Sequence, residues 1–454
     1  MLLKKIKSDG LAHLSYFLGS GSEACVIDPR RDIDSYLDLA HRNGMRITHV
    51  FETHRNEDLV SGAAALGKAT GAKVWHGPNP AEPIRYADTV RDGDSFTIGD
   101  IRIEALETPG HTLDSVSYAA IDPRQGEQAF GVFTGDALFV ADVGRTDFYP
   151  DAKRDMAGKL YDSLQKLLAL GDQAVLYPAH GAGSVCGSGI SKREVSTLGH
   201  ERLFNPHFQF GTREAFIDAK VQEHHYNPPY FKMMERLNVE GGNRPARDVL
   251  PVPLTPNAVF EAGDAQIVDV RGVADFAGAH VPDSYCIPHD MLASFAGWFL
   301  DYERDIILIA RDAEQAEASA VTLARIGYDR IAGFHAGIVP VASNNLPWRS
   351  LDVVDTAVVK SRVKTDDNWT LLDVRALEEF EAGHIEGAVH AYVGHLPDAA
   401  QDKLGMDRVT VMCGSGARAT IAASVLLRSG IRNIDVYLGS MKAWSKAQAS
   451  ATED

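Results

Sequence analysis

The sequence has few cysteines, no long hydrophobic run and no excess of positive charge. Four widely spaced cysteines in 454 residues do not form the disulfide framework of a secreted domain, so we expect a reducing, cytoplasmic location. No apolar stretch is long enough for a transmembrane helix, and the basic start of the chain is not followed by the apolar run of a signal peptide. A formal net charge of −17 argues against nucleic acid or an anionic membrane as a partner.

The sequence is long enough for about two to four domains. Its hydrophobic content of 45% and charged content of 24% are those of an ordinary globular protein. Strand and helix patterns alternate along the chain, which predicts a multidomain α/β protein.

The most informative segment begins at Cys413. Apolar residues before it predict a buried strand, and the apolar run 421–427 after it predicts a helix that ends near Gly430. The thiol would lie at the helix N-terminus, where loop amides, the helix dipole and Arg418 all favour a thiolate. A thiolate held in this way is a nucleophile that can carry a transferable group; the simpler alternative is a structural cysteine in a tight turn. The loop consists of Gly414, Ser415, Gly416 and Ala417.

This loop resembles that of the rhodanese sulfurtransferases, in which the cysteine carries a persulfide sulfur. The related loop of cysteine phosphatases is longer, which suits a tetrahedral phosphate. The segments 371–375 and 383–388 resemble two further rhodanese landmarks. The resemblance covers roughly residues 355–450 and implies an active rhodanese domain with a parallel sheet, which we assign to residues 351–454.

The same landmarks occur a second time, earlier in the chain. Residues 267–271 match 371–375, and Phe276 and His280 match Phe380 and His384. A repeat of this length indicates a duplicated domain, here residues 257–350. Alignment of the two copies puts Ala310 at the position of Cys413 and Gln315 at that of Arg418, so we expect the first copy to be inactive. Cys286 lies elsewhere in this copy, and we expect it to be a core residue.

Residues 1–240 resemble the metallo-β-lactamase fold, an αβ/βα sandwich. Four landmarks appear in the order typical of that family, at 52–62, 108–112, 133–138 and 177–181. Hydrolases of the family hold two metal ions with a His-x-His-x-Asp-His motif. Here Asn56 replaces the second histidine and Leu59 the third, so a two-metal clamp for hydroxide is not expected.

His54, His111 and Asp136 remain as candidate metal ligands. Two imidazoles and one carboxylate form the facial triad of non-haem Fe(II) oxygenases, which leaves positions open for O2 and a sulfur ligand. Zn²⁺ is redox-inert and offers no route to O2 activation. We therefore expect one Fe(II) per chain; the alternative is a degenerate member of the fold without a metal.

A branch of this fold, the persulfide dioxygenases, uses that triad to oxidise a low-molecular-weight persulfide to sulfite and a thiol. The segment 144–148, which contains Arg145, resembles the same branch. The resemblance implies that Arg145 contacts ligands or substrate. We expect Asp58 and His180 to do so too, instead of binding a second ion. Cys186 follows His180 in a glycine-rich loop and should lie near the metal pocket, either as a structural thiol or as a sulfur carrier.

The whole chain resembles bacterial persulfide dioxygenase–rhodanese fusions with an inactive middle rhodanese. This resemblance implies a sulfide-detoxification enzyme with a thiol persulfide, O2 and sulfite or thiosulfate as reactants, and a homo-oligomeric assembly. Two alternatives remain open. One is a zinc thioester hydrolase of the glyoxalase II type joined to a rhodanese, and the other is a metal-free sulfur carrier in which only Cys413 reacts.

Overall fold

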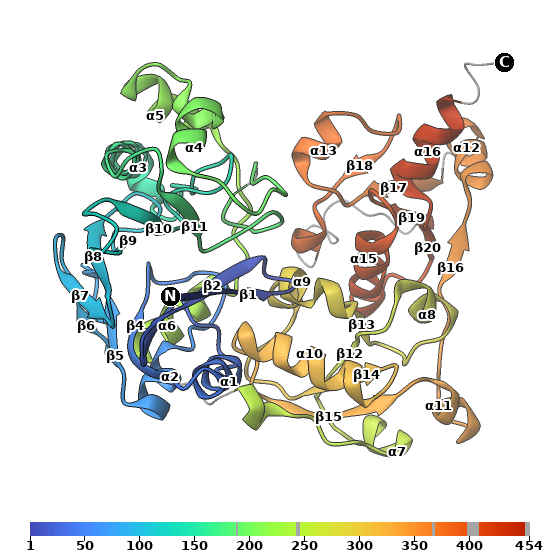
Figure 1. Ribbon diagram of the computed structural model, residues 1–454. Coiled ribbons are helices and arrows are strands. Elements are labelled where there is room, and N and C mark those ends of the chain that lie inside the picture. Colours follow the sequence, from blue (N-terminus) through green and yellow to red (C-terminus); the bar gives the residue numbers. More distant parts are fainter. Residues whose placement is uncertain (188, 242–245, 366–367, 397–407, 450–454) are drawn as a thin grey trace. The chain divides into compact units, whose positions relative to one another are not determined.

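The computed structural model describes residues 1–187, 189–241, 246–365, 368–396 and 408–449 (Figure 1). The chain divides into two compact units. The first comprises Met1–Asp248 together with Ala324–Gly327, and the second comprises Val249–Leu323 and Tyr328–Asp454. None of the described helices is long and apolar enough to cross a membrane.

The first unit contains two mixed sheets (Figure 1). In one sheet the strands follow chain order: β1 (Leu2–Ser8), β2 (His13–Ser20), β3 (Glu23–Ile27), β4 (Arg46–Phe51), β5 (Lys73–His76) and β6 (Asp88–Thr89). The other sheet has the order β11-β10-β9-β8-β7, with β7 (Ser95–Ile98), β8 (Ile101–Glu107), β9 (Val116–Ile121), β10 (Ala129–Gly135) and β11 (Val175–Pro178). Because β8, β10 and β11 run in the same direction, their carboxyl ends meet at one edge of this sheet.

The two sheets pack face to face, and helices cover their outer faces. The core between the sheets joins Tyr16 and Phe51 of the first sheet to Tyr118 and Phe133 of the second. Strand β2 is buried along its whole length, as expected for a strand covered on both faces. The helices are α1 (Asp34–Arg42), α2 (Ala63–Thr70), α3 (Lys153–Leu168), α4 (Leu198–Phe204), α5 (Arg213–Gln222) and α6 (Phe231–Glu240). Apolar clusters join α1 and α2 to the first sheet and α3 to the second, so the predicted αβ/βα sandwich is confirmed.

The second unit contains two parallel sheets. The first has the order β13-β12-β14-β15, with β12 (Gln266–Asp269), β13 (Tyr285–Cys286), β14 (Ile306–Ala310) and β15 (Ile331–Ala336). The other has the order β16-β20-β19-β17-β18, with β16 (Asp352–Val354), β17 (Trp369–Asp373), β18 (Val389–His390), β19 (Arg408–Met412) and β20 (Ile434–Tyr437). The predicted rhodanese-like α/β fold with parallel sheets is therefore confirmed.

Helices connect the parallel strands in both halves of this unit. Those of the first half are α7 (Pro256–Phe260), α8 (Val273–Gly278), α9 (Leu292–Phe299), α10 (Ala313–Arg325) and α11 (Val339–Ser343). Those of the second half are α12 (Thr356–Thr365), α13 (Leu377–Glu381), α15 (Ala417–Arg428) and α16 (Ser440–Ala449). The domain limits 1–240, 257–350 and 351–454 stay predictions from the sequence.

The two halves of the second unit repeat their internal contacts. Arg271 pairs with Asp269 as Arg375 pairs with Asp373, each at 2.6 Å. His280 stacks on Phe276 with ring centroids 4.0 Å apart, and His384 stacks on Phe380 at 3.9 Å. These pairs hold the turns that follow β12 and β17. The residues that are repeated in the two copies therefore stabilise the fold of each copy.

Candidate metal centre and sulfur-transfer loop

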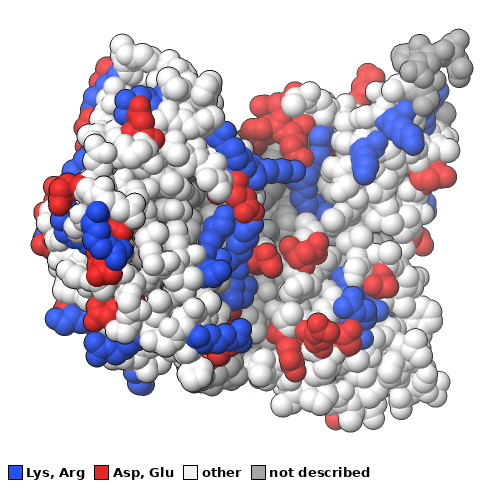
Figure 2. All heavy atoms as spheres, viewed as in Figure 1, with Lys and Arg blue, Asp and Glu red and all other residues white. Residues whose placement is uncertain are grey.

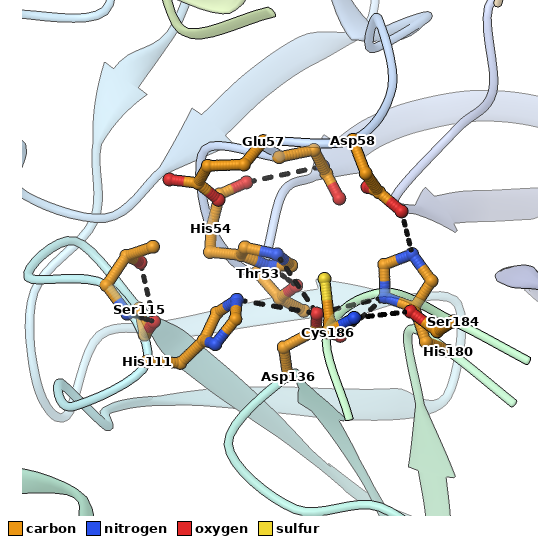
Figure 3. Close-up of polar contacts among 12 residues, drawn as sticks. Thr53, His54, Glu57, Asp58, His111, Ser115, Asp136, His180, Ser184 and Cys186 are labelled. Carbon is orange, nitrogen blue, oxygen red and sulfur yellow. Dashed lines mark hydrogen bonds and ion pairs between the residues drawn. The ribbon is translucent and has the colours of Figure 1, made fainter. Parts of the chain in front are cut away.

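His54, His111 and Asp136 meet at the carboxyl ends of three strands (Figure 3). His54 follows β4, His111 follows β8 and Asp136 follows β10 directly. Nε2 of His111 lies 3.4 Å from Oδ2 of Asp136, and Nε2 of His54 lies 3.7 Å from the same oxygen. All three side chains are buried. The structure therefore brings together the three ligands that the sequence predicted.

Outer hydrogen bonds fix the orientation of both imidazoles. Thr53 donates its hydroxyl hydrogen to Asp28, so Thr53 Oγ1 accepts from Nδ1 of His54 at 2.9 Å. Nδ1 of His111 donates to the backbone carbonyl of Arg145 at 3.0 Å. In both rings the proton is on Nδ1, which leaves the Nε2 lone pair for a metal.

The charges at the site also suit a cation. Burial alone would raise the pKa of Asp136, but His180 and His54 outweigh burial and hold it well below its ordinary value. Burial lowers the pKa of His111 to about 4 and lowers that of His54, partly opposed by Asp136. Neutral imidazoles beside an ionised carboxylate are the protonation states that a metal ion needs.

These residues fit a single divalent cation. Nε2 of His111 is buried and has no hydrogen-bond partner, as expected for a ligand atom. The side chain of Leu59 is buried and provides no ligand, and Oδ1 of Asn56 lacks a partner. The three-histidine arrangement of the family's hydrolases is thus incomplete.

A second group of donors lies beside the triad. Asp58, His180 and Cys186 have ligand atoms within 4.8 Å of one another, and all three are buried. Nδ1 of His180 contacts both oxygens of Asp136, at 2.7 and 2.9 Å. Burial would lower the pKa of His180, but Asp136 and Asp58 raise it well above its ordinary value. The sequence predicted that Cys186 lies near the metal pocket because its loop follows His180, and the structure places it beside His180.

The guanidinium of Arg145 is held by neighbouring residues and does not project freely towards a substrate. Its buried guanidinium bonds to Asp147 at 2.6 Å and to Asn227 at 2.5 Å. Its carbonyl oxygen orients His111, and the neighbouring Phe148 packs edge-on against the His111 ring at 5.1 Å. Arg145 therefore contacts the candidate metal site through its backbone carbonyl. Thr53 and Asp28 were not predicted, because their only signal in the sequence was their place at strand ends. Burial raises the pKa of Asp28 to about 7.

Cys413 lies at the end of β19, where two helices begin. The amide of Gly416 donates to Sγ of Cys413 at 3.1 Å, from a left-handed backbone with φ of +95°. The amide of Cys413 donates to Oγ of Ser440 at 3.0 Å. The amide of Met441, in the first turn of α16, donates to the Cys413 carbonyl at 3.1 Å. The loop thus holds the sulfur at the N-terminus of α15 and is itself held by α16.

Arg418 is engaged by Glu379 of α13. The guanidinium makes two hydrogen bonds to the carboxylate, at 2.5 and 2.8 Å. This pairing lowers the pKa of Glu379. A side chain added at Gly414 would come within 3.3 Å of the guanidinium, so the pair lies beside the loop. The sequence did not indicate that Arg418 has a carboxylate partner.

The middle copy has no nucleophile at the matching position. Ala310 is the last residue of β14, and Gln315 accepts a hydrogen bond from the Arg311 amide and donates to the Val270 carbonyl. The side-chain amide of Gln315 therefore stabilises the turn but brings no positive charge. Cys286 is buried on β13, and burial raises its pKa well above the ordinary value.

Comparisons with known proteins agree with this architecture. Residues 8–180 match the metallo-beta-lactamase superfamily, and residues 257–342 and 356–447 each match the rhodanese-like domain. A metallo-beta-lactamase from Staphylococcus aureus subsp. aureus COL superposes with a TM-score of 0.67 at 29% identity, over 74% of this chain and 99% of that one. The chain therefore combines a metallo-β-lactamase domain with rhodanese-like domains.

Curated relatives include enzymes with two different activities. A hydroxyacylglutathione hydrolase of Rhizobium etli is 36% identical over 145 residues, which are 32% of this chain and 52% of that protein. The mitochondrial persulfide dioxygenase ETHE1 of Bos taurus is 27% identical over 259 residues, which are 53% of this chain and 82% of that protein. The chain spans about half the length of the hydrolases it matches. It is distantly related to both kinds of enzyme.

Proposed function

We propose that this chain is a persulfide dioxygenase with an attached sulfurtransferase. The observation that carries the proposal is the intact set of His54, His111 and Asp136 beside Asn56 and Leu59, where hydrolases of the fold have histidines. Two imidazoles and one carboxylate are the donor set of non-haem Fe(II) oxygenases. The relationship to ETHE1 supports the same activity.

The reaction would be R–SSH + O2 + H2O → R–SH + SO3²⁻ + 2 H⁺. Fe(II) at the triad would supply open positions for O2 and for the substrate sulfur. Thr53 and the Arg145 carbonyl hold the two imidazoles so that both Nε2 atoms face the same point. Phe148, packed against His111 and Phe231, forms an apolar wall that limits water at the site.

The rhodanese loop would then use the sulfite. Cys413 as a persulfide carries a sulfane sulfur, and sulfite attacks the outer sulfur atom. The new S–S bond is that of thiosulfate; the bond to Sγ breaks, and its electron pair leaves Cys413 as a thiolate. The Gly416 amide, which donates to Sγ, stabilises that negative charge. Coupling the two reactions in one chain would limit release of sulfite.

The relationship to hydroxyacylglutathione hydrolases supports a second candidate, a zinc thioester hydrolase joined to a rhodanese. A metal-free sulfur carrier that uses Cys413 alone is the third. Two features disfavour the hydrolase: Leu59 cannot bind a metal, and the amide of Asn56 is a poor ligand for zinc.

Metal analysis and oxygen uptake separate the three candidates. Protein purified without oxygen should contain about one iron per chain and consume O2 when given low-molecular-weight persulfides. About two zinc ions per chain, with thioester hydrolysis and no oxygen uptake, would support the hydrolase. Absence of both metal and oxygen uptake would support the carrier. A panel of glutathione, coenzyme A, bacillithiol and cysteine persulfides would identify the thiol.

A further inference from the structure

The side chain of Asn238 joins helix α6 to the irregular segment that follows His54. Asn238 is buried, and its side-chain nitrogen donates to the carbonyls of Asn56 and Leu59, both at 2.7 Å. Its side-chain oxygen accepts from the amide of Ser61 at 2.8 Å. An asparagine side chain has two N–H donors and one acceptor oxygen, so all of these groups are used on one stretch of backbone.

The segment from Asn56 to Ser61 needs such partners. All of its residues are buried, and residues 56–60 belong to neither a helix nor a strand. Buried backbone groups without partners are destabilising, and here no regular ladder supplies them. The Asn238 side chain therefore replaces, for three backbone groups, the hydrogen bonds that a helix or a sheet would provide.

The position of this segment affects the candidate metal centre in two ways. The segment begins two residues after His54, so the chain itself carries any displacement to that ligand. It also contains Asp58, whose Oδ2 lies 3.0 Å from Nε2 of His180, and Nδ1 of His180 contacts Asp136 at 2.7 Å. Figure 3 shows these contacts from Asp58 through His180 to Asp136. A shift of the segment would therefore reach both His54 and Asp136.

One face of α6 contacts the surroundings of both histidine ligands. Phe231, Glu235 and Asn238 are four and three residues apart, a spacing that puts them on the same side of a helix. Glu235 accepts a hydrogen bond at 2.8 Å from Arg55, the residue next to the first ligand. The ring of Phe231 packs at 6.0 Å against Phe148, which contacts the other imidazole. The helix thus supports the metal centre along its length.

The C-terminal end of α6 is itself fixed against residues 85–86. The carbonyl of Val239 accepts from the amide of Arg85 at 3.0 Å. Gly241 ends the helix with a left-handed φ of +66°, and a Cβ atom there would overlap the ring of Tyr86. Because this contact leaves no room for a side chain, the helix end cannot move towards Tyr86. The helix is thus a firm support from which Asn238 can hold the segment.

We propose that Asn238 is a positioning residue of the candidate metal centre. It acts through the backbone, by fixing the segment that links His54 to the contact between Asp58 and His180, and so it keeps the ligands at distances that suit one cation. Replacement of residues that orient metal ligands from outside typically weakens metal binding about 10–100-fold. The inference rests on a cation at the triad, as in the proposed function, and not on the reaction catalysed there.

Asn238→Leu removes all three hydrogen bonds and keeps roughly the shape of the side chain. Asn205→Leu is the matched control, because the Asn205 side chain is also buried in the N-terminal unit and also makes three hydrogen bonds, to Asp142, Glu201 and His207. Both substitutions exchange one neutral side chain for another, so the surface charges seen in Figure 2 stay as they are. A difference in metal binding between the two variants therefore reports on position, not on charge or on the loss of a buried amide.

Iron binding is measured on full-length, metal-free protein, titrated with Fe²⁺ without oxygen against a chromophoric chelator. Asn238→Leu should bind iron about tenfold more weakly than the wild type, whereas Asn205→Leu should bind it equally well, although both should melt at a lower temperature. The electron paramagnetic resonance spectrum of the nitric oxide adduct of the bound Fe²⁺ reports on ligand geometry. It should change in Asn238→Leu only.

Tyr230→Phe decides the question if Asn238→Leu does not fold. The Tyr230 hydroxyl donates to the Asp58 carbonyl at 3.3 Å, so this variant loses one further hydrogen bond to the same segment. It should fold and bind iron about twofold more weakly than the wild type. Wild-type iron affinity in folded Asn238→Leu, or in Tyr230→Phe where Asn238→Leu is unfolded, would overturn the inference.

Two further results would also overturn it. An equal loss of iron affinity in Asn205→Leu would mean that general destabilisation is the cause, and a wild type that binds no iron would leave Asn238 no centre to position. None of these measurements uses a persulfide or oxygen uptake. A chain that binds iron but consumes no O2 would therefore contradict the proposed dioxygenase and leave the role of Asn238 unaffected.

Discussion

Glu379 accepts two hydrogen bonds from Arg418, so the cation beside the Cys413 loop is already paired with a carboxylate. Bidentate pairs of this kind fix both side chains in place. An incoming sulfite or thiosulfate must compete with Glu379 for the guanidinium. The pair therefore sets how strongly the loop attracts anions.

Replacement of Glu379 by glutamine should strengthen anion binding. Exposed ion pairs contribute about 0.2–1 kcal/mol, so the KM for thiosulfate in sulfurtransferase assays should fall by a factor of roughly 1.4 to 5. Glu381→Gln, at the exposed end of the same helix, removes an equal charge and is the control. An equal fall in KM for both variants would mean that only the overall charge matters.

Cys413→Ser should abolish sulfur transfer and leave persulfide-dependent oxygen uptake largely intact. The triad lies in the N-terminal unit and Cys413 in the other, so we expect the two reactions to proceed independently. The product should shift from thiosulfate to free sulfite, which ion chromatography would quantify. An unchanged ratio of the two anions would mean that sulfur reaches sulfite by another route, with Cys186 the first residue to suspect.

His111→Ala should remove iron and oxygen uptake together. The variant loses one of three ligands and leaves Asp136 without one of its neighbouring imidazoles. Sulfur transfer by Cys413 should remain measurable. His41→Ala, an exposed histidine on α1, is the control and should retain wild-type iron content. Normal iron and oxygen uptake in His111→Ala would contradict the ligand assignment.

The middle rhodanese copy should form no persulfide. Ala310 cannot be a nucleophile, Gln315 brings no positive charge, and burial raises the pKa of Cys286. Mass spectrometry of Cys413→Ser incubated with thiosulfate should find no sulfur adduct on peptides from this copy. The wild type, in which Cys413 should gain one sulfur, is the positive control. An adduct on Cys286 would show that buried thiol to be reactive.

The sequence predicted the architecture and the triad because both depend on local patterns. His111 and Asp136 follow β8 and β10, which run the same way and end at one edge of their sheet, and His54 follows β4 of the other sheet. The Arg418–Glu379 pair joins residues 39 positions apart, and no spacing rule relates a helix to a loop that far away. Thr53 and Asp28 were missed for the same reason, since their role depends on the hydrogen bond that the Thr53 hydroxyl gives to Asp28. Arg145 was expected to contact ligands or substrate; its backbone carbonyl contacts His111, whereas Asp147, two residues further on, pairs with its guanidinium.

The hydrogen bonds between α16 and the Cys413 loop have a consequence for folding during translation. Ser440 accepts from the Cys413 amide, and the amides of Met441 and Lys442 donate to the carbonyls of Cys413 and Gly414. These partners are synthesised well after the cysteine itself. During translation the thiol therefore leaves the ribosome before the contacts that shape its loop exist, and the loop can reach its final form only when α16 has followed. The N-terminal unit, which carries the candidate triad of His54, His111 and Asp136, has by then had time to fold.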